Sequence, residues 1–270
     1  MNNEEKLVYA QEKEKIGERI DLPELITRLV DIANANKPFY MLRLGDCTVR
    51  ILRGDPLKMT DPFAHPGGNF CDKESAEYLV NGMREAIDNV DMCGIFKNDA
   101  DIFMGIESSG VKIPLVRFHA FNNLLFACDK RFVDAILRTK KLLIINNRAA
   151  QYKKILDETL PESNSIVFPG DAALKNKSDC EKVLEFVRTA DYEVAIVSMG
   201  MWADKILHEV KKAGKIGIDY GHALDHHIIG QYPINAEYDN MADYCNVYHG
   251  KKLANGENVI PANLGSQYRI

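Results

Sequence analysis

The segment from Glu193 to His222 limits the fold of this chain more than any other part of the sequence. Two short apolar runs, Val194–Val197 and Ile216–Ile218, flank a stretch of helical periodicity that stops before Gly214. Glycine and polar residues follow each apolar run. The pattern predicts a β-α-β unit with two parallel strands. In open sheets of this kind, ligands bind where the strands end, and the start of the next helix favours an anion.

The rest of the chain alternates in the same way. Strands are expected at 39–44, 93–96, 141–146 and 165–168, and helices at 4–19, 22–36, 73–90, 100–110, 118–138, 148–160 and 178–189. The alternation predicts an α/β, Rossmann-like, mostly parallel sheet with helices on both faces. We expect a single domain overall, with an N-terminal helical segment over 1–36 followed by the Rossmann-like part over 37–270.

Composition narrows the function classes. The formal net charge is −5 and no run of Lys and Arg stands out, which argues against nucleic acid as a partner. No apolar run approaches the roughly 20 residues of a membrane span, and the polar N-terminus lacks a signal-peptide pattern. The six cysteines contain no CxxC pair, so we expect reduced thiols and a cytoplasmic location. The charged N-terminal helix is compatible with packing on another subunit, as in a homo-oligomer.

The first candidate group follows the expected strand at 39–44. Asp46 is well placed to hold a divalent cation or a ribose hydroxyl, and the alternative is that it caps the next helix. Arg43 and Gly45 are candidates for contact with a nucleotide or a sugar, because an Arg can pair with a phosphate.

The second group lies within and just after the β-α-β segment from Glu193 to His222. Ser198 and Gly200 follow its first strand and are expected to contact a diphosphate or ribose, although an ordinary tight turn also explains them. Asp219 lies where a dinucleotide site places its ribose-binding acid, but one glycine in place of three makes NAD a weak choice. His222 and Asp225 are the candidate catalytic residues, with His222 as a phosphate or metal contact and Asp225 as a base.

Other residues complete the set of candidates. Asn146 and Arg148, after the strand at 141–146, suit sugar hydroxyls or a phosphate. Ligand contacts are also plausible for Arg117, His119 and Asn122, and for Asp61 and His65 in a long loop, whereas Trp202 is expected in the core and His226 and His227 at the surface. Motifs of common hydrolases and phosphoryl transferases are missing from the sequence.

Three stretches resemble one known family. RLGDCT, at Arg43–Thr48, resembles the R-x-GDGE opening of the bacterial GT-D-type glycosyltransferases. VSMGMWADKILHEVKKAGKIGIDYGH, ending at His222, resembles the closing block of that family, and IVFPGDAAL resembles a strand between the two. The resemblance implies a Rossmann-like domain that transfers a sugar from a nucleotide-sugar donor, typically a UDP-sugar, to a glycan or glycoprotein acceptor in cell-surface assembly.

The resemblance also implies a divalent metal, Mn²⁺ or Mg²⁺, held with help from an Asp-x-Glu motif. Asp46 takes the place of the motif's Asp, whereas Thr48 stands where the Glu is expected. Two alternatives therefore remain. One is a non-catalytic module that binds a nucleotide or sugar, and the other is another Rossmann-like transferase, such as an S-adenosylmethionine-dependent methyltransferase.

Overall fold

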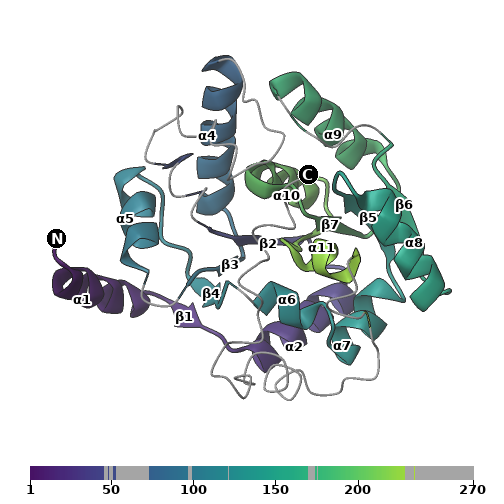
Figure 1. The fold of residues 1–270 in the computed structure, drawn as a ribbon, viewed down its shortest axis with the longest axis horizontal. Helices are drawn as coiled ribbons and strands as arrows, with labels where there is room; N and C mark the ends of the chain where they lie inside the picture. The colour runs from purple at the N-terminus through teal and green to yellow at the C-terminus, as the bar shows by residue number, and fades with distance from the viewer. Residues whose placement is uncertain are drawn as a thin grey trace, which may run out of the picture.

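The computed structural model describes residues 1–45, 48, 51–52, 73–96, 99–120, 122–169, 174, 176–228 and 234. The described strands form one eight-stranded sheet in the order β1-β4-β3-β2-β8-β7-β5-β6 (Figure 1). They are β1 (Glu18–Arg19), β2 (Phe39–Arg43), β3 (Met92–Gly94), β4 (Val116–Phe118), β5 (Lys141–Ile145), β6 (Asn164–Val167), β7 (Val194–Val197) and β8 (Ile216–Asp219). All pairings between them are parallel, which confirms the predicted α/β sheet.

Helices cover both faces of the sheet (Figure 1). One face carries α4 (Lys73–Asp88), α5 (Ala100–Ser108), α9 (Lys177–Thr189) and α10 (Ala203–Lys212). The other carries α2 (Leu22–Ala35), α6 (Asn122–Phe126), α7 (Lys130–Phe132), the π-helix η2 (Val133–Leu137), α8 (Ala149–Thr159) and α11 (Ala223–Ile228). Side chains of β2 alternate between the two cores, with Tyr40 and Leu42 on the α10 side and Phe39 and Met41 on the α2 side. This alternation follows from the two-residue period of a strand.

Helix α2 shows how closely the local sequence sets an element. The carboxylate of Asp21 accepts a hydrogen bond from the backbone N–H of Glu24 at 2.9 Å, which caps the first turn. At the other end, Asn36 adopts a left-handed conformation with φ of 47°. Asn tolerates this conformation better than most residues, so the helix ends there. The predicted helix over 22–36 is confirmed.

Two short strands were missing from the sequence-based expectation. The N-terminal helix α1 (Asn3–Glu14) ends earlier than expected, and β1 follows at Glu18. The expected helical region at 118–138 is preceded by β4, and α6, α7 and η2 divide it. Both missed strands are only two or three residues long and contain Arg19 or Arg117. An apolar period cannot be recognised over so few residues.

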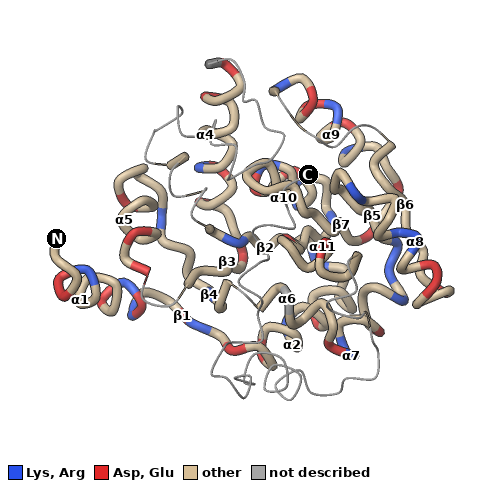
Figure 2. The backbone as a smooth tube through the Cα atoms, viewed as in Figure 1, with Lys and Arg blue, Asp and Glu red and all other residues tan. Residues whose placement is uncertain are grey.

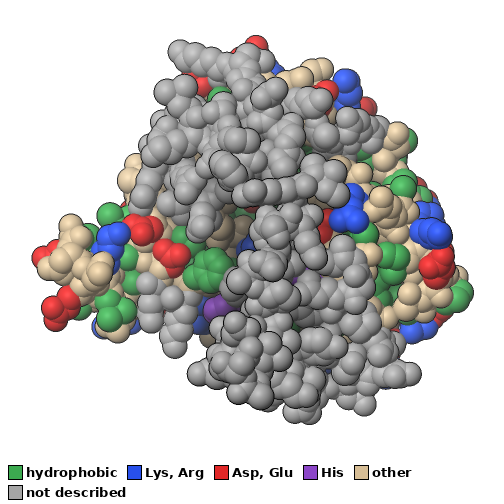
Figure 3. All heavy atoms as spheres, in the orientation of Figure 1, with side chains coloured by type: hydrophobic (Ala, Val, Ile, Leu, Met, Phe, Trp, Pro, Cys, Tyr) green, Lys and Arg blue, Asp and Glu red, His purple; other side chains and the backbone are tan. Residues whose placement is uncertain are grey.

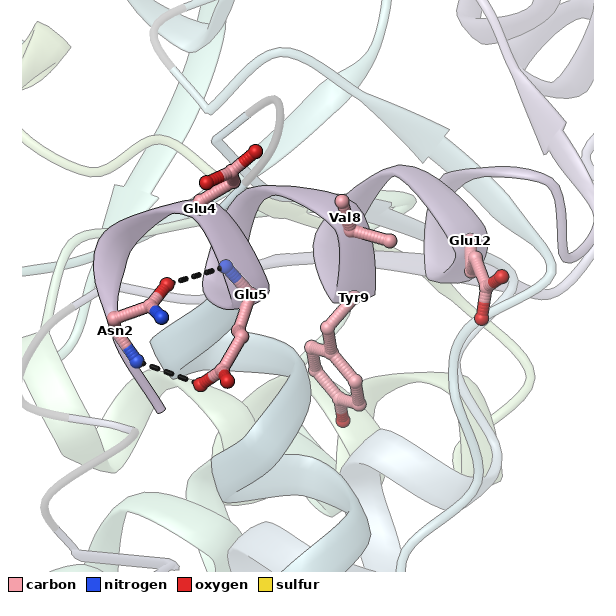
Figure 4. Close-up of a pocket in the computed structure, with 6 residues that line it drawn as sticks. All are labelled: Asn2, Glu4, Glu5, Val8, Tyr9 and Glu12. Carbon is pink, nitrogen blue, oxygen red and sulfur yellow. Dashed lines mark hydrogen bonds between the residues drawn. The ribbon is translucent and has the colours of Figure 1, made fainter.

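Helix α1 lies at the periphery of the molecule, beyond α5, and charged residues run along it (Figure 2). It is held to α5 by an ion pair between Lys6 and Asp101 at 3.0 Å and by contacts of Tyr9 and Lys13 with Glu107. A hollow on its surface is lined by Asn2, Glu4, Glu5, Val8, Tyr9 and Glu12 (Figure 4).

The visible surface of the described residues intersperses acidic and basic side chains (Figure 3). Within the described segments, every helix falls short of the length and apolar character that a membrane crossing requires. The described cysteines Cys93, Cys128 and Cys180 are buried free thiols.

Candidate functional site

The candidate residues converge because parallel strands all end at the same side of the sheet, here called its carboxyl end. Strands β2, β8, β7 and β5 are consecutive neighbours in the sheet. Arg43 is the last residue of β2 and Asp219 the last of β8. Ser198 follows β7 directly, and Asn146 follows β5 directly. The structure therefore brings residues from four distant parts of the chain to one place, as expected for a ligand site in an open α/β sheet.

Asp219 joins the ends of β2 and β8. One of its carboxylate oxygens accepts a hydrogen bond from the backbone N–H of Arg43, and the other accepts from the N–H of Gly221, each at 2.9 Å. Its side chain is buried, and burial raises the pKa of the carboxyl group, while Arg43 and the two N–H groups act in the opposite direction. Asp219 thus ties the end of β2 to the turn that follows β8. Its contact with a ribose stays a prediction.

Asn146 joins β5 to β7 in the same manner. Its amide nitrogen donates to the carbonyl of Ser198 at 2.6 Å, and its amide oxygen accepts from the N–H of Arg148 at 2.7 Å. The side chain is 8% exposed. Both ends of the amide are therefore engaged with the backbone, and Asn146 shapes the turn that presents Arg148.

Arg148, Asp225 and His222 form a polar cluster beside this turn. A nitrogen of the Arg148 guanidinium lies 3.3 Å from one oxygen of Asp225, and Nδ1 of His222 lies 3.7 Å from the other. The Asp225 side chain is 18% exposed, whereas that of His222 is 64% exposed. The carboxylate is therefore held between two basic groups, with the imidazole facing solvent.

The turn after β7 leads into a helix start without a side-chain cap. Gly200, which is exposed, has φ of 54° and begins the short 3-10 helix η3 (Gly200–Trp202) that continues into α10. Neither η3 nor α10 has a side-chain hydrogen bond at its N-cap. The hydroxyl of Ser198 is buried and has no hydrogen-bond partner among the residues that the structure describes. Helix starts of this kind suit anions, because their N–H groups are free to donate.

Asp204 is a buried acid that the sequence did not single out. It lies in the first turn of α10 and is 2% exposed, and within the described segments its Oδ2 has no hydrogen-bond partner. Burial raises its pKa well above the usual value, and the nearby charge of Asp219 adds to the effect, while Arg43 opposes it. In the sequence it resembled the acids that commonly begin helices. Only the packing of α10 on the sheet shows that it faces inward.

Arg117 requires a correction. It was expected as a ligand contact, but its guanidinium is fully buried within β4 and donates to backbone carbonyls of Glu14, Ile16 and Pro114. These bonds tie the chain before β1 to the segment that precedes β4, and burial lowers the pKa of the group. Full burial and the bonds from its two terminal nitrogens to backbone carbonyls indicate a structural role.

The two histidines after Asp225 also differ from expectation. His226 and His227 were expected at the surface, but they are 7% and 4% exposed. The ring of His227 stacks on Tyr152, with centroids 5.8 Å apart, inside the core between α8 and α11. Both histidines belong to the buried residues of the short helix α11. Trp202, expected in the core, is 3% exposed there.

The expected metal site is only partly within the described residues. Asp46, Asp61 and His65 lie outside them, whereas Gly45 lies just after β2 and Thr48 is buried. Across the described segments, no group of three His, Cys, Asp or Glu side chains is arranged to hold a metal ion. Thr48 offers a hydroxyl where a second carboxylate would be needed. The described side chains thus do not by themselves form a divalent-cation site, and the role of Asp46 as a metal ligand stays a prediction.

His119 directly follows β4, and Asn122 is the first residue of α6. The His119 ring packs edge-on against Phe96, with centroids 5.7 Å apart, and burial and Arg19 lower its pKa. Asn122 is largely buried at the start of α6. Its neighbour Asn123 reaches the carboxyl end of the sheet, where its amide nitrogen donates to the carbonyl of Tyr220 at 3.0 Å.

Comparisons with known proteins agree with this architecture. Two solved structures each align over 98% of this chain and 94% of their own length, with a TM-score of 0.54. One, 14% identical, is a selenomethionine-substituted structure of domain of unknown function 1792, and the other, 13% identical, is presented as evidence that this domain has a distinct glycosyltransferase fold. This likeness concerns the fold alone.

The search of curated proteins gave no match. A family model, described as a GT-D fold-like domain, matches residues 20–227. The match covers most of the chain and includes all three stretches on which the sequence resemblance rests. The chain belongs to the GT-D fold-like family.

Proposed function

We propose that this protein is a glycosyltransferase that uses a nucleotide-sugar donor, with a UDP-sugar as the first candidate. The observation that carries the proposal is the convergence of Arg43, Asp219, Ser198 and Asn146 at the ends of four adjacent strands in a GT-D fold. We further propose an acceptor in cell-surface glycan or glycoprotein assembly, which derives from the family resemblance, and a cytoplasmic location, which derives from the cysteine pattern and the polar N-terminus.

The diphosphate of the donor is assigned to the start of η3 and α10. The positive end of the helix dipole there would stabilise the charge that develops on the leaving diphosphate. Gly200 leaves room for close approach, because it is exposed and carries no side chain. Asp204 lies in the same first helical turn, and its raised pKa favours the neutral carboxyl group, which does not repel an anion.

The catalytic pair of the proposal is His222 and Asp225. His222 is exposed at the carboxyl end and is assigned to the donor phosphates, and Asp225 is assigned to the proton of the acceptor hydroxyl. Arg148 holds the Asp225 carboxylate at 3.3 Å and so orients it. Orientation of a base toward the attacking hydroxyl contributes directly to rate.

Asp46 is the residue we assign to Mn²⁺ or Mg²⁺. Such an ion would neutralise charge on the leaving diphosphate. Thr48, which is buried, cannot supply the second carboxylate of the family motif. This substitution favours a second candidate function, namely a non-catalytic module that binds a nucleotide or a sugar on the same fold.

Isothermal titration of UDP, with and without Mn²⁺, tests the assignment. We expect wild-type protein to bind UDP, and His222→Ala and Arg148→Ala to bind it about 10- to 100-fold more weakly. The first variant loses the proposed phosphate contact, and the second loses the group that holds Asp225 beside His222. Asp46→Ala is expected to remove only the part of the affinity that Mn²⁺ adds.

Lys154→Ala is the matched control for Arg148→Ala. Lys154 lies in α8, is 78% exposed and pairs only loosely with Glu158 at 3.8 Å. Its loss removes one positive charge from the same helix at a distance from the carboxyl end, and affinity should stay unchanged. If wild type does not bind UDP, or if His222→Ala and Asp46→Ala bind it as wild type does, the assignment is wrong.

A further inference from the structure

Arg43 and Asn123 meet beside Gly221 at the carboxyl end of the sheet. A Cβ atom on Gly221 would lie 2.3 Å from the amide nitrogen of Asn123 and 3.1 Å from Nε of Arg43. Both side chains therefore touch the same backbone turn from segments far apart in the sequence. The φ of Gly221 is 49°, so only glycine leaves this pair in place without strain or collision.

Each of the two side chains has one buried polar atom, Oδ1 of Asn123 and Nε of Arg43, for which the described part of the chain offers no hydrogen-bond partner. The opposite end of the Asn123 amide is engaged, because its nitrogen donates to the carbonyl of Tyr220. Buried polar atoms nearly always have partners, so an acceptor and a donor without partners, on two side chains that both touch Gly221, point to a ligand group.

The chemistry of the two atoms limits what this group can be. The N–H of Arg43 needs an acceptor, and Oδ1 of Asn123 needs a donor. A hydroxyl provides both, whereas an ionised phosphate oxygen only accepts and a hydrocarbon does neither. A sugar or ribose hydroxyl therefore matches the pair.

The surrounding backbone holds the pair rigidly. Asp219 accepts hydrogen bonds from the N–H groups of Arg43 and Gly221, so the end of β2 and the turn after β8 have a fixed separation. Asn123 is 1% exposed and anchored to the same turn. Such preorganisation is what specific recognition of one polar group requires.

We propose that Arg43 and Asn123 form a subsite that recognises one hydroxyl of the nucleotide-sugar, which rests on the function proposed above. In this subsite Nε–H of Arg43 donates to the hydroxyl oxygen, and the hydroxyl donates to Oδ1 of Asn123. Asn123 is thereby a specificity-determining residue. The hydroxyl belongs either to the ribose or to the donor sugar, and the chemistry of recognition is the same for both.

Calorimetric titration of the full chain with paired ligands tests the subsite. The pairs are UDP against its 2′-deoxy and 3′-deoxy analogues, and UDP-glucose against its singly deoxygenated glucose analogues. Wild type is expected to prefer the hydroxylated member of one pair by about tenfold or more, because a site built for a hydroxyl rejects the analogue without it. Asn123→Leu and Arg43→Lys are expected to bring that ratio close to one.

The ligand pair in which the variants lose the preference identifies the hydroxyl that the subsite recognises. A ratio lost within the UDP pairs assigns it to the ribose, and a ratio lost only within the UDP-glucose pairs assigns it to the donor sugar. Arg43→Lys keeps the positive charge and removes Nε, so it carries the test if Asn123→Leu does not fold. Tyr220→Phe is the control, because it removes a buried hydroxyl that bonds Tyr152 at 3.1 Å. It should lower stability and leave the ratios unchanged.

Two results would contradict the subsite. If wild type binds UDP but shows no preference in any pair, or if the preference is the same in wild type and both variants, the two side chains have a structural role only and the proposed function stands. If wild type does not bind UDP at all, the proposed function fails, and this inference fails with it.

Discussion

Asp204 shows how a single residue can make the stability of this protein depend on pH. Burial raises its pKa, and the neighbouring Asp219 adds to the shift. The folded state therefore keeps the proton at pH values where the unfolded carboxyl group has lost it. The free energy of unfolding must then fall as pH rises from about 4, the ordinary aspartate pKa, towards the raised value in the folded state.

Asp204→Asn removes this dependence, because the amide cannot ionise. At pH 8 we expect the variant to be more stable than wild type by at least about 1 kcal/mol, and near pH 4 we expect the difference to approach zero. Denaturant unfolding at the two pH values measures it. Asp157→Asn is the matched control, since Asp157 is 47% exposed in an ion pair with Lys153 and its loss should change stability by less than about 0.5 kcal/mol at either pH. A variant less stable than wild type at pH 8 would contradict this account.

Some residues of the site could be predicted from their position in the chain and others could not. Asn146, Ser198 and Asp219 directly follow or end apolar runs, and parallel strands end together, so their convergence follows from the sequence pattern. The burial of Asp204 and the central place of Asn123 depend on how α10 and α6 pack on the sheet. Packing of this kind joins distant segments, and no local pattern records it.

Long helices and strands of this chain can be predicted from local sequence, whereas its shortest strands cannot. Helix α2 is specified by its own capping residues, and β5 and β7 by apolar runs of four or five residues. Strands β1 and β4 lack an apolar run of this length. Pairing with β4 holds β1 in the sheet, and β4 itself contains the buried, charged side chain of Arg117. The guanidinium of Arg117 fixes this region from inside, and two of the carbonyl groups it reaches, those of Glu14 and Ile16, are remote in sequence.

Gly17 is the point at which β1 meets its neighbour. A Cβ atom there would lie 2.1 Å from the carbonyl oxygen of Leu115, the same oxygen that accepts a hydrogen bond from Glu18 at 2.7 Å. Gly17→Ala should therefore disrupt the pairing of β1 with β4. We expect a loss of about 2 to 4 kcal/mol in unfolding free energy, from the left-handed backbone together with the collision.

Gly110→Ala separates the two causes. Gly110 has nearly the same backbone angle, with φ of 74° against 75° for Gly17, but a Cβ atom there would meet nothing within 4 Å. Its substitution should cost only the conformational part, about 1 to 2 kcal/mol. Equal losses in the two variants, measured by denaturant unfolding, would show that the contact with Leu115 does not matter.

At the scale of the whole molecule, alternation of strands and helices predicts a parallel sheet with two covered faces, and the structure has both. The order of the strands is less accessible to sequence reasoning. Strand β2 lies beside β8, near the other end of the described chain, and this pairing puts Arg43 next to Asp219. The juxtaposition of Arg43 and Asp219 in the candidate site therefore arises from topology, because β2 and β8 are far apart in the sequence.

Release of UDP from a UDP-sugar tests the central claim most directly. If the convergence at the carboxyl end is a catalytic donor site, wild-type protein with Mn²⁺ should release UDP from at least one UDP-sugar slowly in the absence of acceptor, and Asp225→Asn should release it at least about 100-fold more slowly. UDP binding with no release from any UDP-sugar tested would contradict catalysis and favour the non-catalytic binding module.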